Sequence, residues 1–218
     1  MTASPPTPPP NRNAAELRYL ALGDSYTIGE GVEPEGRWPV RLARGLRSEG
    51  IPLADPHIVA ATGWTTDELS AAIDAAEPLG RFDFASLLIG VNNQYRGRSV
   101  DDYRGELDGL LSRATAFVAG RAERVLALSI PDWGATPFAI QSGRDRDLIA
   151  AELDLYNAAA RAACAARGIA FVDIAPLSRE LGGDEAMLAD DGLHPSAAMY
   201  AQWARLALPV ARRLLSAA

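Results

Sequence analysis

Short apolar segments alternate with longer amphipathic segments along the chain. The short segments predict five buried strands, over Arg18–Leu22, His57–Ala61, Phe84–Ile89, Arg124–Ile130 and Ile169–Ile174. The segments with helical periodicity predict five helices, over Pro39–Ser48, Thr66–Ala76, Val100–Val118, Asp145–Arg167 and Ser196–Leu215. Strands that alternate with helices are typical of a parallel sheet with crossover helices. We therefore expect an α/β fold, a three-layer α/β/α sandwich with a five-stranded parallel sheet.

The length of the chain and its first residues predict the domain organisation. With 218 residues and 48% apolar content, the chain can bury one sizeable core. Five of the first 13 residues are proline, and such a composition buries too little apolar surface to offset the entropy lost on ordering. We expect a proline-rich disordered tail over residues 1–13 and a single domain over residues 14–218.

Charge and composition argue against several classes of partner. The formal net charge of −7 is spread along the chain without a basic block, so we expect no nucleic-acid partner. No apolar run has the length of a secretory signal or a membrane span, so we expect a cytoplasmic protein with no membrane attachment. Two distant histidines and the lone Cys164 lack metal-ligand spacing, so we expect no metal and no cofactor. The oligomeric state stays open.

The end of the first predicted strand carries candidate chemistry. In open parallel sheets, functional groups gather beyond the carboxyl ends of the strands. Here the strand runs directly into Gly23-Asp24-Ser25, a tight turn that presents Ser25 where the following backbone N–H groups could bind an anion. The alternative is an ordinary Asp-Ser turn whose side chains only satisfy the backbone. This segment alone does not separate the two interpretations.

Four short blocks resemble the GDSL or SGNH hydrolase family, and they follow that family's order. They are Gly23-Asp24-Ser25, Gly63 after the second strand, Gly90-Val91-Asn92-Asn93 after the third, and Asp191-Gly192-Leu193-His194 before the last helix. The resemblance spans Tyr19 to the C-terminus. It implies that Ser25 is the nucleophile and that an oxyanion is bound by the N–H groups of Ser25 and Gly63 and by the Asn92 amide. One position departs from the pattern, because Asn93 replaces an aspartate that is thought to support this loop.

A serine nucleophile needs a base within hydrogen-bond reach, and the chain holds two histidines. His57 opens the second predicted strand, at the end away from the carboxyl ends, so we interpret it as a surface or strand-end residue. His194 remains, and Asp191, three residues earlier, can hold one imidazole nitrogen while the other faces Ser25. Asp190 is the adjacent competitor, but Asp191 matches the motif. The same segment can also cap the last helix, and both interpretations can hold together.

Aromatic residues near the strand ends are candidate walls of a substrate pocket, namely Tyr26, Trp64, Tyr95 and Trp133. Packing in the core or at its rim is the alternative for each of them. The nucleophile is presented after the first strand, because the Gly-x-Ser-x-Gly elbow of the α/β-hydrolases is absent.

These residues predict a serine hydrolase that cleaves small-molecule carboxylic esters, with short acyl or acetyl groups favoured, through an acyl-serine intermediate. A lipase or thioesterase of the same family is one alternative. A flavodoxin-like phosphate- or flavin-binding module is another, because the loop Ser25–Gly29 could cradle a phosphate in the same architecture. The Asp191 and His194 pair argues against a flavin-binding module and against a catalytically silent carbohydrate-binding relative. Neither of these proteins would need an acid and a base at these positions.

Overall fold

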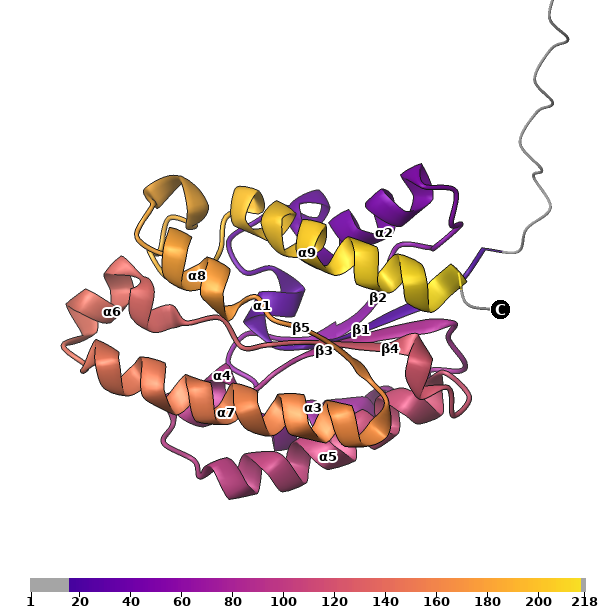
Figure 1. Ribbon diagram of the computed structural model, residues 1–218, viewed down its shortest axis with the longest axis horizontal. Helices are drawn as coiled ribbons and strands as arrows, with labels where there is room; N and C mark the ends of the chain where they lie inside the picture. The colour runs from indigo at the N-terminus through magenta and orange to yellow at the C-terminus, as the bar shows by residue number, and fades with distance from the viewer. Residues whose placement is uncertain (1–15, 217–218) are drawn as a thin grey trace, which may run out of the picture.

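Five parallel strands form a single sheet with helices on both faces (Figure 1). The computed structural model describes residues 16–216, so the predicted tail over residues 1–13 lies outside the described residues. The strands are β1 (Tyr19–Gly23), β2 (His57–Ala60), β3 (Phe84–Leu88), β4 (Val125–Leu128) and β5 (Ala170–Val172). Their order in the sheet is β2-β1-β3-β4-β5, which is the flavodoxin-like order. The predicted three-layer fold is confirmed.

Long helices form the two outer layers. They are α2 (Trp38–Ser48), α3 (Thr66–Ala76), α5 (Val100–Phe117), α7 (Arg146–Arg167) and α9 (Ala197–Ser216). Helices α2 and α9 pack together on one face of the sheet, and α3, α5 and α7 cover the other (Figure 1). Helix α7 ends at the predicted residue, Arg167, because Gly168 follows it in the left-handed region at φ 68°, a conformation that glycine adopts without steric cost.

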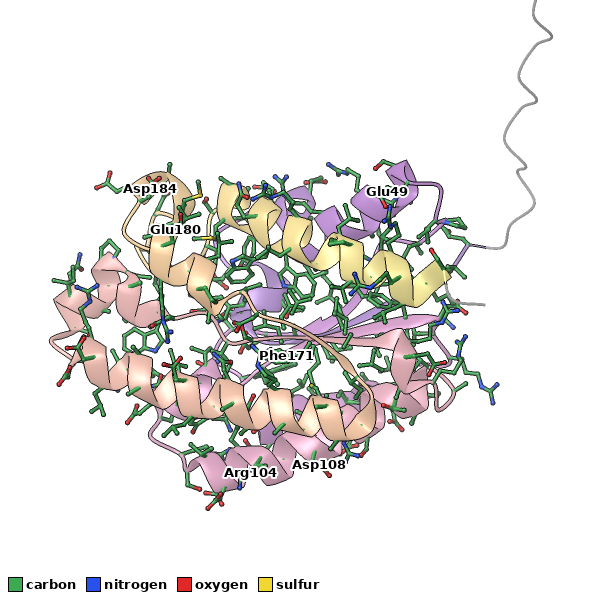
Figure 2. All side chains as sticks on the ribbon, viewed as in Figure 1. Glu49, Arg104, Asp108, Phe171, Glu180 and Asp184 are labelled. Carbon is green, nitrogen blue, oxygen red and sulfur yellow. The ribbon has the colours of Figure 1, made fainter. Side chains whose placement is uncertain are left out.

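The register of the sheet aligns the strand ends that matter for function. Gly23, the last residue of β1, lies opposite Ala60 of β2 and Leu88 of β3. All residues of β1 and β3 are buried, as expected for parallel strands covered on both faces. Figure 2 shows side chains filling the space between the sheet and both helix layers, while the labelled Arg104 and Asp184 point outward. The core therefore holds the carboxyl ends of β1, β2 and β3 at one edge.

Several short helices were not predicted from the sequence. Each follows the carboxyl end of a strand, and they are α1 (Ser25–Ile28), α4 (Val91–Tyr95), α6 (Pro137–Ser142) and α8 (Ala175–Leu181). Single 3-10 turns are η1 (Pro34–Gly36), η2 (Ala122–Arg124), η3 (Trp133–Ala135) and η4 (Glu185–Met187). Segments this short do not span enough turns for a helical period to show in the sequence.

No helix within residues 16–216 combines the length and the apolar character that crossing a membrane requires.

Candidate active site

Only glycine fits at the last position of β1, where the strand enters the turn that carries Ser25. A Cβ added at Gly23 would lie 2.2 Å from Thr27 Oγ1 and 2.4 Å from the Leu88 carbonyl oxygen, well inside van der Waals contact. Asp24 then caps α1, because its Oδ1 accepts the Tyr26 N–H at 3.0 Å. Ser25 follows as the first residue of α1 and is 4% exposed. This turn therefore holds Ser25 at the edge of the sheet.

Asp24 is fully buried beneath this turn. Burial disfavours the carboxylate and raises the pKa of Asp24 to about 7, although the backbone N–H groups of Tyr26, Asp24 and Gly90 favour the charged form. Gly90 lies beyond the end of β3, so the Asp24 carboxyl faces backbone from two strand ends. Its Oδ1 holds the turn that carries Ser25, and its buried Oδ2 has no hydrogen-bond partner within residues 16–216.

Asp191 orients the imidazole of His194. Its Oδ1 accepts the backbone N–H groups of Leu193 and His194, both at 2.9 Å, and its Oδ2 lies 2.5 Å from His194 Nδ1. Burial alone would raise the pKa of Asp191, but these hydrogen bonds from the His194 ring and the two amides outweigh it and lower the pKa. A carboxylate beside Nδ1 places the proton there and leaves Nε2 as an acceptor.

The same segment also caps the last helix. The Ser196 hydroxyl accepts the N–H groups of Ala198 and Met199 at 3.2 and 3.4 Å, and it donates to the Ala186 carbonyl at 2.8 Å. Capping and base orientation therefore coexist in this loop, in agreement with the sequence analysis. The Tyr26 ring contacts the imidazole edge to face, with ring centroids 5.8 Å apart and planes at 60°.

One cavity of about 250 Å³ collects these groups at the carboxyl edge of the sheet. Its lining residues come from five strand-end segments and are Ser25, Tyr26, Thr62, Gly63, Val91, Asn92, Tyr95, Trp133, Phe138, Leu193 and His194. No hydrogen bond joins the Ser25 hydroxyl to His194 in the described part of the chain. Such contacts are often long in unliganded sites and tighten when substrate binds.

Three residues with unused hydrogen-bond donors line this cavity, and they come from separate strand ends. The amide N–H groups of Ser25 and Gly63 donate to no other group within residues 16–216, so both are free for a ligand. The Asn92 side chain donates one amide hydrogen to the Trp64 carbonyl at 2.9 Å, and its second hydrogen is available because a carboxamide carries two. Gly63 has φ 85°, which is a conformation that suits glycine.

Comparison of the sequence with protein-family models identifies the family of this chain. The family model of the GDSL-like Lipase/Acylhydrolase family matches residues 21–202, more than half of the chain. The chain belongs to this family. The resemblance carried by the four sequence blocks is therefore confirmed, and a hydrolase is favoured over the flavin-binding alternative.

Several solved structures share this GDSL fold. TesA is 20% identical over 90% of this chain and 99% of its own, with a TM-score of 0.70. A lipase/acylhydrolase from Enterococcus faecalis is 18% identical over 90% of this chain and 96% of its own, with a TM-score of 0.70. An acetyl xylan esterase from Geobacillus stearothermophilus is 22% identical over 92% and 94%, with a TM-score of 0.67. At these identities the likeness shows the fold. No match was found among curated proteins.

Asn93, the departure from the GDSL pattern, has a clear physical setting. It is fully buried, its Oδ1 accepts the Thr66 N–H at 3.1 Å, and its Nδ2 donates to Thr66 Oγ1 at 2.6 Å. Nδ2 also lies 3.4 Å from Glu106 Oε2, which accepts the Thr66 hydroxyl and pairs with Arg98 at 3.2 Å. An aspartate here would face the Glu106 carboxylate, whereas an amide can donate to it. Asn93 therefore binds Thr66 and can also donate a hydrogen bond to the Glu106 carboxylate.

Three of the four aromatic residues predicted to line the pocket do so. Tyr26, Tyr95 and Trp133 line the cavity, whereas the Trp64 side chain packs against the core and only its carbonyl contributes, by accepting from Asn92. Trp133 is 2% exposed and its indole N–H donates to the Gln94 side chain at 2.8 Å.

Four lining residues were not identified from the sequence, namely Thr62, Val91, Phe138 and Leu193. Thr62, Val91 and Leu193 are neighbours of motif residues in the chain and could have been found by that adjacency. Phe138 belongs to the unpredicted helix α6, whose first turn is tied to the His194 loop by a hydrogen bond from the Phe138 N–H to the Gly192 carbonyl at 3.1 Å. No sequence signal pointed to this contact.

Other candidate chemistry lies away from the cavity. His57 is exposed at the start of β2, 6.0 Å from the Phe82 ring. Cys164 is buried in α7, where burial raises the pKa of its thiol to about 11 and disfavours the reactive thiolate. Within residues 16–216, no group of three His, Cys, Asp or Glu side chains is placed to hold a metal ion.

Proposed function

We propose that this GDSL family member hydrolyses carboxylic esters with short acyl groups through an acyl-serine intermediate. The observation that carries the proposal is the Asp191 and His194 pair, bonded at 2.5 Å, in a cavity that also contains Ser25 and free anion donors. A nucleophile, a base oriented by a carboxylate, and donors for an oxyanion are the groups that acyl transfer requires.

In the first half-reaction, Ser25 Oγ attacks the ester carbonyl carbon while His194 Nε2 takes the hydroxyl proton. Asp191 stays ionised and stabilises the imidazolium that forms. The negative charge that develops on the carbonyl oxygen is bound by the N–H groups of Ser25 and Gly63 and by the second Asn92 amide hydrogen. The tetrahedral intermediate collapses, the alcohol leaves with the proton from His194, and the acyl group remains on Ser25.

In the second half-reaction, water attacks the acyl-serine carbonyl and gives a proton to His194. The same donors bind the second oxyanion. Collapse breaks the Ser25 ester bond, His194 returns its proton to Oγ, and the carboxylic acid leaves.

The size and lining of the cavity support a small acyl group. A cavity of about 250 Å³ is slightly smaller than most small-molecule sites, which span roughly 300 to 1,000 Å³. Its walls are largely aromatic and aliphatic, with Tyr95, Trp133, Phe138 and Leu193 around the polar catalytic groups. The name of one structural neighbour, acetyl xylan esterase, is that of an enzyme that acts on acetyl groups. Acetyl and other short esters are therefore our proposed substrates.

The test is hydrolysis of p-nitrophenyl esters from acetyl to octanoyl by wild type and Ser25→Ala. We expect the highest kcat/KM with the shortest acyl groups, and a loss on the order of 10⁴-fold or more in kcat for Ser25→Ala. The control is Ser112→Ala, which removes a hydroxyl from the exposed face of α5. A fluorophosphonate should label wild type at Ser25.

Retention of most activity by Ser25→Ala would disprove the proposed nucleophile. A kcat/KM that rises steadily with acyl length would show a lipase-like substrate range instead. Faster turnover of the matching acyl thioesters would favour a thioesterase.

A further inference from the structure

The two oxyanion donors that lie outside the Ser25 turn come from different segments. Gly63 lies in the β2–α3 loop (residues 61–65), and Asn92 lies in α4 after β3. Within residues 16–216 no backbone–backbone hydrogen bond joins these two segments, and side chains of the second segment donate to backbone carbonyls of the first. Arg96, the residue that follows α4, extends from the Asn92 segment to the Gly63 segment.

The Arg96 guanidinium makes two charge-assisted contacts across this junction. Nη2 donates to the Gly63 carbonyl at 2.6 Å, and Nη1 donates to Glu68 Oε1 at 3.1 Å. The other Glu68 oxygen accepts the Thr65 N–H at 2.8 Å, in the capping box that starts α3. Arg96 therefore binds the β2–α3 loop at Gly63 and the helix that follows it at Glu68.

Gly63 needs such an external restraint. It has no Cβ, its φ is 85°, and its backbone can rotate more freely than that of any other residue type. Rotation of its peptide groups would turn the N–H away from the cavity. The carbonyl of the neighbouring residue, Trp64, is already held by Asn92 at 2.9 Å. Arg96 holds the Gly63 carbonyl, and so fixes the Gly63–Trp64 peptide that directly follows the peptide carrying the Gly63 N–H.

We propose that Arg96 is a positioning residue that keeps the Gly63 N–H directed at the oxyanion. This inference rests on the proposed function. Arg96 does not line the catalytic cavity, so it acts through the β2–α3 loop and not on the substrate. The side chains of Arg96 and Glu68 are 48% and 40% exposed, and exposed ion pairs contribute little to folding stability. Loss of Arg96 should therefore lower catalysis without unfolding the protein.

The experiment compares wild type, Arg96→Ala, Arg96→Lys and Arg104→Ala in p-nitrophenyl acetate hydrolysis. Arg104 is a matched control, because it is an exposed arginine in an ion pair with Asp101 that makes no contact with the β2–α3 loop. We expect kcat of Arg96→Ala to fall about 10- to 100-fold with KM nearly unchanged, less than for outright removal of an oxyanion donor, which costs roughly 100- to 1000-fold. Arg96→Lys should retain an intermediate kcat.

Two further readouts separate positioning from a general structural role. Phenylboronic acid, which forms a tetrahedral adduct with an active serine, should bind Arg96→Ala more weakly by the same factor by which kcat/KM falls. Added guanidinium chloride at non-denaturing concentration should restore part of the kcat of Arg96→Ala and none of Arg104→Ala. The thermal midpoint of Arg96→Ala should match that of wild type.

Wild-type kcat and boronate affinity in Arg96→Ala would overturn the inference. A loss of kcat that tracks a lowered thermal midpoint, with no rescue by guanidinium, would overturn it as well. Failure of the proposed function is distinguishable, because wild type would then show no ester hydrolysis that depends on Ser25.

Discussion

Replacing Asn93 by Asp, the usual residue of the GDSL pattern, should destabilise this protein. In the variant, a carboxylate oxygen takes the place of Nδ2, which lies 3.4 Å from Glu106 Oε2. Two negative charges at that separation repel by about 5 kcal/mol at an effective dielectric constant of about 20. The Glu106 side chain is 32% exposed and Arg98 pairs with it, so solvent and the guanidinium offset part of this repulsion.

Proton uptake sets a ceiling on the cost. Keeping one carboxyl of the pair protonated at pH 7, against an ordinary pKa near 4, costs about 4 kcal/mol. We therefore expect Asn93→Asp to lower the free energy of unfolding by about 2 to 4 kcal/mol at pH 7. Because the repulsion raises a carboxyl pKa in the folded state, this deficit should be full above that pKa and should shrink as the pH falls toward 4.

The assay is urea unfolding at pH 7 and pH 5 in a double-mutant cycle of Asn93→Asp and Glu106→Gln. The double variant exchanges amide and carboxylate between the two positions. The new amide at position 106 can then donate to the Thr66 hydroxyl, and that hydroxyl can donate to the new carboxylate at position 93, which reverses the present chain of hydrogen bonds. Most of the lost stability should return. Equal destabilisation by Asn93→Asp in both backgrounds, or a neutral effect at pH 7, would refute the reasoning.

Three further predictions concern the same edge of the sheet. Asp191→Asn should lower kcat for p-nitrophenyl acetate by about 10³- to 10⁴-fold with little change in KM, because a neutral amide no longer fixes the Nδ1–H tautomer of His194; an unchanged kcat would contradict this role. Gly90→Ala should lower the free energy of unfolding by about 2 to 4 kcal/mol, because its Cβ would lie 2.5 Å from the Tyr103 ring at a φ of 126°. Gly105→Ala, which has open space around its Cβ position, should show no such loss in the same urea titration. Asp24 has a pKa raised by burial to about 7, so wild type should lose up to about 4 kcal/mol of stability relative to Asp24→Asn between pH 4 and pH 7; parallel stability curves for the two proteins would refute that pKa.

The fold was largely predictable because its signals are local and repeated. Five strands and five long helices follow from the alternation of apolar runs with helical periods. Each observed end lies within two residues of the predicted one. Helix α4 could not be predicted in this way. It spans Val91–Tyr95, and it follows Gly90 at φ 126°, where the Tyr103 ring leaves no room for a Cβ; this tertiary contact is not visible in a local pattern.

The candidate site was predictable only where chemistry is encoded in motifs. Ser25, Gly63, Asn92 and His194 were placed in one site by the sequence blocks, and the structure brings them to one cavity. Trp64 was assigned to the pocket because it follows a strand end, but the direction of its side chain depends on the backbone after Gly63. That backbone is set by tertiary hydrogen bonds, which a sequence pattern does not reveal.

Asn93 and Arg96 illustrate why these tertiary contacts must be interpreted together. Asn93 binds Thr66 at the start of α3, and Arg96 binds the Gly63 carbonyl, so both restrain the β2–α3 loop from the Asn92 segment. Asn93→Asp should therefore lower kcat as well as stability, because movement of Thr66 displaces the loop. The two effects have different remedies. Glu106→Gln should restore kcat in Asn93→Asp, where the fault is like-charge repulsion, but not in Arg96→Ala, where a hydrogen bond to Gly63 is missing. Rescue of both variants by Glu106→Gln would show that loop stability in general, and not the separate contacts, controls the oxyanion donors.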